Sequence, residues 1–268
     1  MNATTTTTRT YEYRLTGAGI IRSEFIKLRT VRSTVWLYAS MVVTSVGIAA
    51  LVATASGNTS DSPILPLTAA TIGTSLGQLV AAVLGVLVVS GEYATGMIRS
   101  TISAVPKRLP ALGAKMLVLF VTTFVVGLVS TFGALFAALP ILGSQGVEAD
   151  YSDGTLVGSL MLAALYLALV SVFSLGLGTL LRNSAAGIAV ALGTILLLPT
   201  IMQIISALTQ AQWALDLLPY LFSSAGMGMY LPGTGSAGFD QWQSTLIVLA
   251  WVAAPVIAGA VLLKRRDA

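Results

Sequence analysis

The sequence contains no cysteine and no histidine among its 268 residues. Thiolate and imidazole are the usual protein ligands of zinc, haem iron and iron–sulfur clusters. Their absence also excludes disulfide bonds and catalysis by cysteine or histidine. We therefore expect no zinc, haem or iron–sulfur site in this chain, and we assign no metal site to it.

Charged residues are also scarce: only 9% of the chain is charged, and 56% is hydrophobic. A typical soluble domain has about 25% charged residues. So few charges cannot cover a water-exposed surface, and most of the surroundings must be lipid. The composition predicts an all-α membrane protein.

Catalytic motifs are missing as well. None of the four lysines (Lys27, Lys107, Lys115 and Lys264) follows a glycine-rich phosphate-binding loop. There is no Gly-x-Ser-x-Gly motif, and no apolar segment carries paired carboxylates. We therefore do not expect this chain to be an enzyme.

Six apolar segments each approach or exceed the ~20 residues that a membrane-spanning helix needs. Pro199 and Gln203 interrupt the fifth, which predicts a kinked helix there. The predicted spans are residues 35–55, 69–90, 113–139, 155–181, 185–208 and 243–263.

In this six-span layout, all 14 lysines and arginines lie on one side of the membrane. The loops on the other side contain aspartate and glutamate but no basic residue. Because basic loops stay in the cytoplasm, the pattern predicts a multi-pass protein of the cell membrane with both termini cytoplasmic.

The N-terminal region before the first span divides into two parts. The threonine-rich residues 1–16 are predicted to be a disordered tail, and residues 17–268 a single transmembrane domain. Residues 17–34 are predicted to form a basic amphipathic helix in the membrane interface. A solvated lead-in to the first span is the alternative, because Glu24 falls inside the apolar stripe. The residues assigned to the interfacial helix are Glu24, Phe25, Lys27, Arg29 and Arg32.

The connection between the last two spans, residues 209–242, is long and unusually apolar. It predicts one or two short helices in the outer leaflet. Its aromatic residues suit a membrane–water interface: Trp213, Tyr220, Phe222, Tyr230 and Trp242.

Two features within the spans suggest contacts between helices. Small residues recur every fourth position at Gly73, Gly77, Ala81 and Gly85, which allows close packing either within one subunit or between two. Gln78 and Gln203 are candidates for a translocation path, although for Gln78 we favour a hydrogen bond to a neighbouring helix. No span carries an ionisable residue at its centre, which disfavours a proton- or sodium-coupled carrier.

Residues 91–110 form a short basic segment between the second and third spans. We interpret it as the contact for a soluble partner. The alternative is that its charges serve only membrane topology and headgroup contact. The charged residues here are Glu92, Arg99, Lys107 and Arg108, with Lys115 just beyond.

Three stretches resemble ABC transporter permeases of the type-2 exporter class. SEFIKLRTVRSTVWL is similar to the segment before their first helix, and LPYLFSSAGMGMY loosely resembles their outer segment between spans five and six. GEYATGMIRSTISAVPKR resembles their coupling helix, and we assign Tyr93 and Lys107 of this stretch to the ATPase-docking contact together with the matching residues. These matches are Glu24, Phe25, Lys27, Leu28, Arg29, Arg32, Ser33 and Thr34 in the first stretch, and Glu92, Gly96, Arg99, Pro106 and Arg108 in the coupling segment.

The resemblance implies a permease that pairs with a second copy or a paralogue and with separate ATP-binding cassette ATPase subunits. ATP and Mg would bind those subunits, and this chain would hold no cofactor. Its partners would include lipids but no nucleic acid. Export of an amphipathic or hydrophobic cargo is expected, such as a lipid, a peptide or a drug, the last as in multidrug resistance. The alternative is a non-transporting scaffold or sensor that recruits a cytoplasmic partner.

Overall fold

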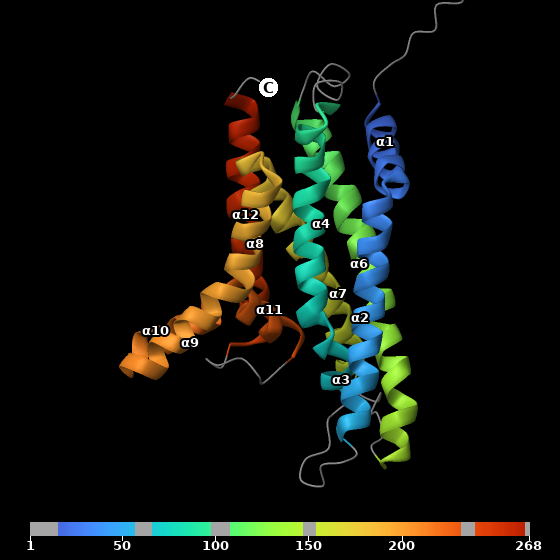
Figure 1. The fold of residues 1–268 in the computed structure, drawn as a ribbon, viewed down its shortest axis with the longest axis vertical. Coiled ribbons are helices and arrows are strands. Elements are labelled where there is room, and N and C mark those ends of the chain that lie inside the picture. The colour runs from blue at the N-terminus through green and yellow to red at the C-terminus, as the bar shows by residue number, and fades with distance from the viewer. Residues whose placement is uncertain (1–15, 57–65, 98–107, 147–153, 232–238, 266–268) are drawn as a thin grey trace, which may run out of the picture.

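A computed structural model describes residues 16–56, 66–97, 108–146, 154–231 and 239–265 (Figure 1). These residues form helices and no strand. Six helical segments are long and apolar enough to cross a membrane, which confirms the predicted all-α fold with six spans. The segments are Arg32–Ser56, Pro66–Ala94, Leu109–Ser144, Thr155–Leu181, Ser184–Thr209 and Gln241–Arg265.

The first span is preceded by a separate helix. Helix α1 (Gly17–Thr30) begins where the Thr16 side chain accepts a hydrogen bond from the Gly19 backbone N–H. It ends at Val31, whose backbone is extended, and α2 (Arg32–Ser56) follows directly. The predicted disordered tail comprises residues 1–16. All of it except Thr16 lies outside the described residues.

The second span consists of two helices and the third of one, and residues 98–107 lie between the two spans in the chain. The second span combines α3 (Pro66–Ile72) and α4 (Thr74–Ala94), and the third is α6 (Arg108–Ser144). The third helix is longer than the predicted span of residues 113–139, because it continues through Pro140. The extra turn is held by tertiary contacts: the Gln145 side chain donates a hydrogen bond of 2.9 Å to the Ala53 carbonyl.

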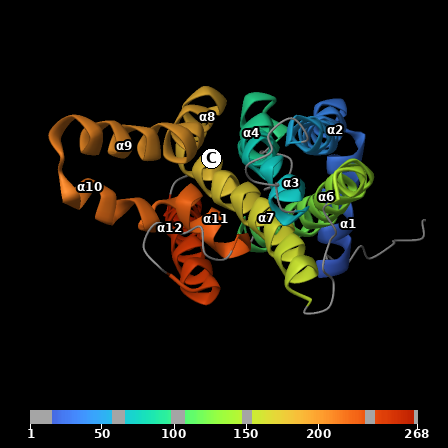
Figure 2. The same ribbon diagram turned by 90° about the horizontal axis from the view of Figure 1, so that it is seen from below.

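Helix α7 (Thr155–Leu181) is the centre of the bundle. It lies between α4 and α6 on one side and the last helices of the chain on the other (Figure 2). Its backbone approaches α4 so closely that a Cβ on Gly85 would overlap the carbonyl of Ser171. Tyr166 and Phe173 of α7 pack against Phe222 in the main hydrophobic core.

The predicted kink in the fifth span is confirmed. Helix α8 (Ser184–Leu192) is followed by a π-helical turn, η1 (Gly193–Leu197), and by α9 (Leu198–Thr209), which leads away from the bundle (Figure 2). The turn alters the backbone hydrogen bonding, and the Ser223 hydroxyl donates a bond of 3.0 Å to the Ile195 carbonyl. A neighbouring polar side chain thus supports the irregular backbone.

The predicted short helices before the last span are also present: α10 (Gln212–Leu217), the 3₁₀ turn η2 (Leu218–Tyr220) and α11 (Phe222–Tyr230). Helix α12 (Gln241–Arg265) completes the fold. Trp213, Tyr220 and Trp242 are exposed, but the interfacial assignment of Phe222 and Tyr230 is wrong. Both are buried, because α11 turns back into the bundle and packs on α7 and α12.

The described basic residues gather at one end of the bundle, where α1 and the C-terminal end of α12 lie (Figure 1). We call this the basic end. Asp216 and Asp240 lie on elements at the opposite end. The basic residues concerned are Arg22, Lys27, Arg29, Arg32, Lys115, Arg182, Lys264 and Arg265.

The contact between Gly85 and Ser171 predicts that Gly85→Ala destabilises the fold by about 1–3 kcal/mol, because the added methyl overpacks a backbone contact. Gly91→Ala is the matched control on the same helix, since nothing lies within 4 Å of a Cβ there. The control should be neutral, or more stable by up to about 1 kcal/mol through helix propensity. Thermal unfolding in detergent measures both, and equal melting temperatures would contradict the proposed packing.

Candidate functional site

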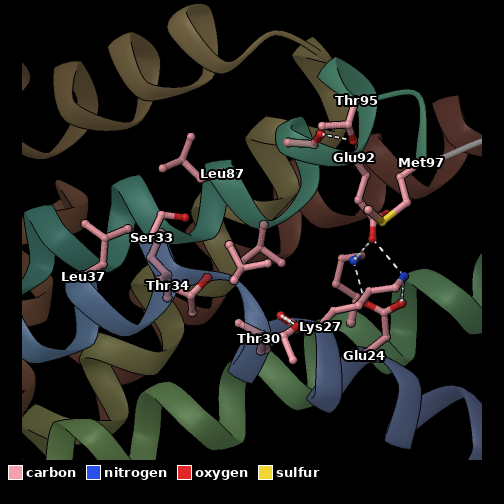
Figure 3. A pocket seen from close by; sticks show the side chains of 16 residues that line it. Glu24, Lys27, Thr30, Ser33, Thr34, Leu37, Leu87, Glu92, Thr95 and Met97 are labelled. Atoms are coloured by element: carbon pink, nitrogen blue, oxygen red, sulfur yellow. Dashed lines mark hydrogen bonds and ion pairs between the residues drawn. The ribbon is translucent and has the colours of Figure 1, made fainter.

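Four charged side chains from three separate helices meet at the basic end (Figure 3). Glu24 and Lys27 come from α1, Glu92 from the last turn of α4, and Lys115 from the start of α6. We call Glu24, Lys27, Glu92 and Lys115 the four-charge cluster. It joins α1 to the two helices that border residues 98–107.

Acidic and basic groups alternate within the four-charge cluster. Lys115 Nζ lies 2.6 Å from Glu24 Oε2 and 2.8 Å from Glu92 Oε1. Lys27 Nζ lies 2.6 Å from Glu24 Oε1 and 3.0 Å from Glu92 Oε1. Each ammonium therefore bridges both carboxylates, and the charges of the four groups sum to zero.

The cluster is largely shielded from solvent. The side chains of Glu24, Glu92 and Lys115 are 4%, 8% and 8% exposed, and that of Lys27 is 32% exposed. Buried ions lose their hydration and are tolerated only when every charge has well-placed partners. Removing a single member should therefore cost more than removing an exposed ion pair.

The charge state of Lys27 follows from these contacts. Burial lowers the pKa of Lys27, but hydrogen bonds from its ammonium to Glu24 and Glu92, together with their charges, outweigh burial and raise the pKa above its ordinary 10.5. A pKa that is higher in the folded chain stabilises the fold at any pH below the unfolded value. That stabilisation is lost only as the pH rises through the folded value, so the ion pairs persist at neutral pH.

A second set of contacts holds α4 from its other side. The Arg182 guanidinium lies over the Tyr93 ring, 5.3 Å from its centroid. The Ser184 hydroxyl donates a hydrogen bond of 2.8 Å to the Ser90 hydroxyl. Arg182 forms the turn between α7 and α8, so the end of α4 is attached to this turn as well as to the four-charge cluster.

Arg182 also adopts an unfavourable backbone conformation. Its φ of 53° lies in the left-handed region that favours glycine. For a residue with a Cβ, this conformation costs roughly 1–2 kcal/mol. Gln210 has the same φ of 53°, and for Arg182 the contact that the structure shows is the one with Tyr93.

The structure brings only part of the predicted basic segment into these contacts. Glu92 and Tyr93 participate, whereas Gly96 forms an exposed left-handed turn just after α4. Arg108 is the first residue of α6. The residues outside the described part of the chain are Arg99, Pro106 and Lys107.

The residues assigned to the interfacial helix also divide. Glu24 and Lys27 enter the four-charge cluster, while Phe25, Arg29 and Arg32 are exposed. Glu24 and Leu28 are the buried residues of α1, on the face that packs against the bundle. Ile21, Phe25 and Val31 of the predicted apolar stripe are exposed. Lys115 was not among the predicted site residues, although a lysine near the start of a long apolar helix is a signal of a buried partner.

The small-residue stripe of α4 faces this chain's own helices. Gly73 packs against the Ser45 backbone of α2, and Gly77 lies near Met41 and Leu167. Gly85 contacts α7, and Ala81 is buried in the core that α4 and α7 share.

The two glutamines proposed for a translocation path lie in different surroundings. Gln78 is buried, and its side-chain oxygen accepts a hydrogen bond of 2.6 Å from the Tyr166 hydroxyl. Gln203 is exposed on α9, which leads away from the bundle (Figure 2). The structure therefore does not bring them together.

A comparison with protein families finds a match over residues 20–197 to the family described as ABC-2 family transporter protein. The match covers more than half of the chain and includes the four-charge cluster and Arg182. No curated protein matches the chain. Within the residues that the structure describes, no group of three or more acidic side chains is placed to hold a metal ion.

The four-charge cluster predicts a large effect of Lys115→Met, which leaves two buried carboxylates with one lysine. We expect a loss of about 3–5 kcal/mol in the free energy of unfolding. Lys264→Met is the matched control, because Lys264 is exposed at the same end of the bundle. Both are measured by unfolding in detergent, and a Lys115→Met variant as stable as the control would show that the cluster does not hold the helices together.

Proposed function

The chain belongs to the ABC-2 transporter family, and from this premise we propose that it is the permease of an exporter powered by a separate ATPase subunit. Its six apolar helices make it a multi-pass membrane protein. The ATPase partner, the outward direction of transport and the cytoplasmic position of the basic end belong to the proposal. They follow from the family and from the positive charges at that end.

The observation that carries the proposal is the place of the four-charge cluster along the chain. Its members Glu92 and Lys115 stand on either side of residues 98–107, the segment we expect to contact the ATPase. Both are tied to α1 through Glu24 and Lys27. A force applied to this segment would therefore move the ends of α1, α4 and α6 as one unit.

The contacts on the far side of α4 extend this unit to the second half of the bundle. Tyr93 and Ser90 attach α4 to the turn between α7 and α8. In the proposed mechanism, closure of the ATPase subunits on ATP shifts the basic segment, and the attached helix ends rotate together. Because Glu92 is buried, we assign it to holding the helix ends together, and we assign the docking contacts to the residues of the basic segment outside the cluster.

The apolar interior of the spans supports an amphipathic or hydrophobic cargo such as a lipid, a peptide or a drug. The charged residues of the described chain lie at the ends of the spans, so no charge at mid-depth is available to carry an ion. Large apolar side chains such as Trp36, Phe136 and Leu208 are exposed and would face lipid or a second permease copy.

A non-transporting scaffold is the other candidate, because the same basic segment would serve to recruit a partner. The family match favours the permease. Co-purification of the full-length chain with a candidate ATPase, followed by ATP hydrolysis in lipid, distinguishes them. The permease requires a complex whose hydrolysis falls when Arg99 and Lys107 are replaced by alanine, and hydrolysis that is indifferent to them would favour the scaffold.

The contact between Arg182 and Tyr93 leads to a prediction with a close control. Arg182→Gly relieves the left-handed backbone but removes the guanidinium, so ATP hydrolysis by the complex should lose its response to cargo. Gln210→Gly relieves the same conformation, φ 53°, at the opposite end of the bundle, where the side chain is exposed. It should retain the wild-type response. If both variants behave like wild type, the turn between α7 and α8 takes no part in coupling.

A further inference from the structure

A pocket of about 340 Å³ adjoins the four-charge cluster at the basic end (Figure 3). One wall is the corner between α1 and α2, and the other is the last three turns of α4. All four members of the cluster line its polar part. The rest of the lining is mainly aliphatic and includes Leu37, Leu84, Leu87 and Val88.

Glu92, one of the residues that line the pocket, has a carboxylate oxygen without a partner. Glu92 Oε1 accepts hydrogen bonds from Lys27 and Lys115, but Glu92 Oε2 is buried without a hydrogen bond from any described residue. Glu92 as a whole is only 7% exposed. Leaving a buried carboxylate oxygen unbonded is unfavourable, so a hydrogen-bond donor at this position would stabilise the site.

The charge of the cluster restricts what that donor can be. The two carboxylates and two ammoniums already balance, so a third cation would meet Lys27 and Lys115 without a spare negative charge. An anion is unfavourable because Glu92 Oε2 accepts hydrogen bonds, and an anion would have no donor to offer it. The site therefore favours an uncharged group with an O–H or N–H.

The shape of the pocket restricts the remainder of the ligand. The lining residues of α4 from Leu84 to Glu92 rise roughly 12 Å along the helix, and those of α2 reach Leu37 beside them. Such a groove suits an extended hydrocarbon chain. Its volume is at the lower end of the roughly 300–1,000 Å³ of small-molecule sites, which favours one chain rather than a two-chain phospholipid.

We propose that this pocket binds a single-chain amphiphile with an uncharged hydroxyl-bearing end, of the monoacylglycerol type. Its hydroxyl donates to Glu92 Oε2, and its chain lies between α2 and α4. Binding there requires neither ATP nor a partner subunit, so its test is separate from that of the export function. A ligand at this place would contact the elements that we expect to move together.

The test uses the full-length chain in phosphatidylcholine vesicles and monolauroylglycerol with a photoreactive group in its acyl chain. Cross-links should map to the pocket lining of α2 and α4. Unlabelled monolauroylglycerol should compete at a concentration about tenfold or more below that of methyl laurate, which lacks the donor. Equal competition would overturn the proposal, as would stronger competition by dodecylammonium or laurate.

Two tryptophan variants of α4 test the location. Leu87→Trp fills the groove and should abolish cross-linking at these positions. Leu76→Trp is the control, since Leu76 is 45% exposed on the same helix and does not line the pocket. Cross-linking of Leu87→Trp at the wild-type level would overturn the proposal. If Leu87→Trp fails to fold, the competition series in the wild-type chain still decides.

Discussion

The burial of two carboxylates and two ammoniums at the edge of the membrane is the constraint on which the basic end depends. None of these charges is stable there alone, because each has lost most of its water. They are tolerated because Glu24, Lys27, Glu92 and Lys115 alternate in sign at distances of 2.6–3.0 Å. This requirement sets the positions of α1, α4 and α6 relative to one another.

The same end of α4 is held from the opposite side by weaker but directional contacts. Arg182, which has a left-handed backbone conformation, places its guanidinium over Tyr93. Further along α4, the close approach of Gly85 to Ser171 leaves no room for the two helices to slide. Helix α4 therefore connects the two halves of the bundle, as the proposed coupling mechanism requires.

Much of the fold could be predicted from the sequence because lipid imposes a simple rule. Apolar runs of sufficient length become spans, and Pro199 marks the break in the fifth. The boundaries were less predictable: α6 continues past Pro140 because contacts from Gln145 hold its end, and no local pattern contains that information. Phe222 and Tyr230 are of the residue types typical of a membrane interface, but both are buried because α11 packs against the bundle.

The four-charge cluster itself could be predicted only in part. Glu24 was an acidic residue within the apolar stripe of α1, and Glu92 was an acidic residue within the basic segment. Their common partner Lys115 lies 91 positions from Glu24 and 23 from Glu92, so no sequence spacing links them. A buried ion network depends on how the helices pack together. From the sequence alone, each of its members is only a charged residue that does not fit the local pattern.

The most direct test of this account measures whether the contacts on both sides of α4 make one rigid unit. The chain has no native cysteine, so spin labels at Ser23→Cys and Asn183→Cys report the distance between α1 and the turn between α7 and α8. Labelled chains diluted with unlabelled ones keep the measurement within a subunit. We expect one narrow distance that ATP and the ATPase partner leave unchanged, and a broad distribution when Lys115→Met is added. A distance that changes with ATP in the otherwise wild-type chain would show that these elements move independently and would contradict the account.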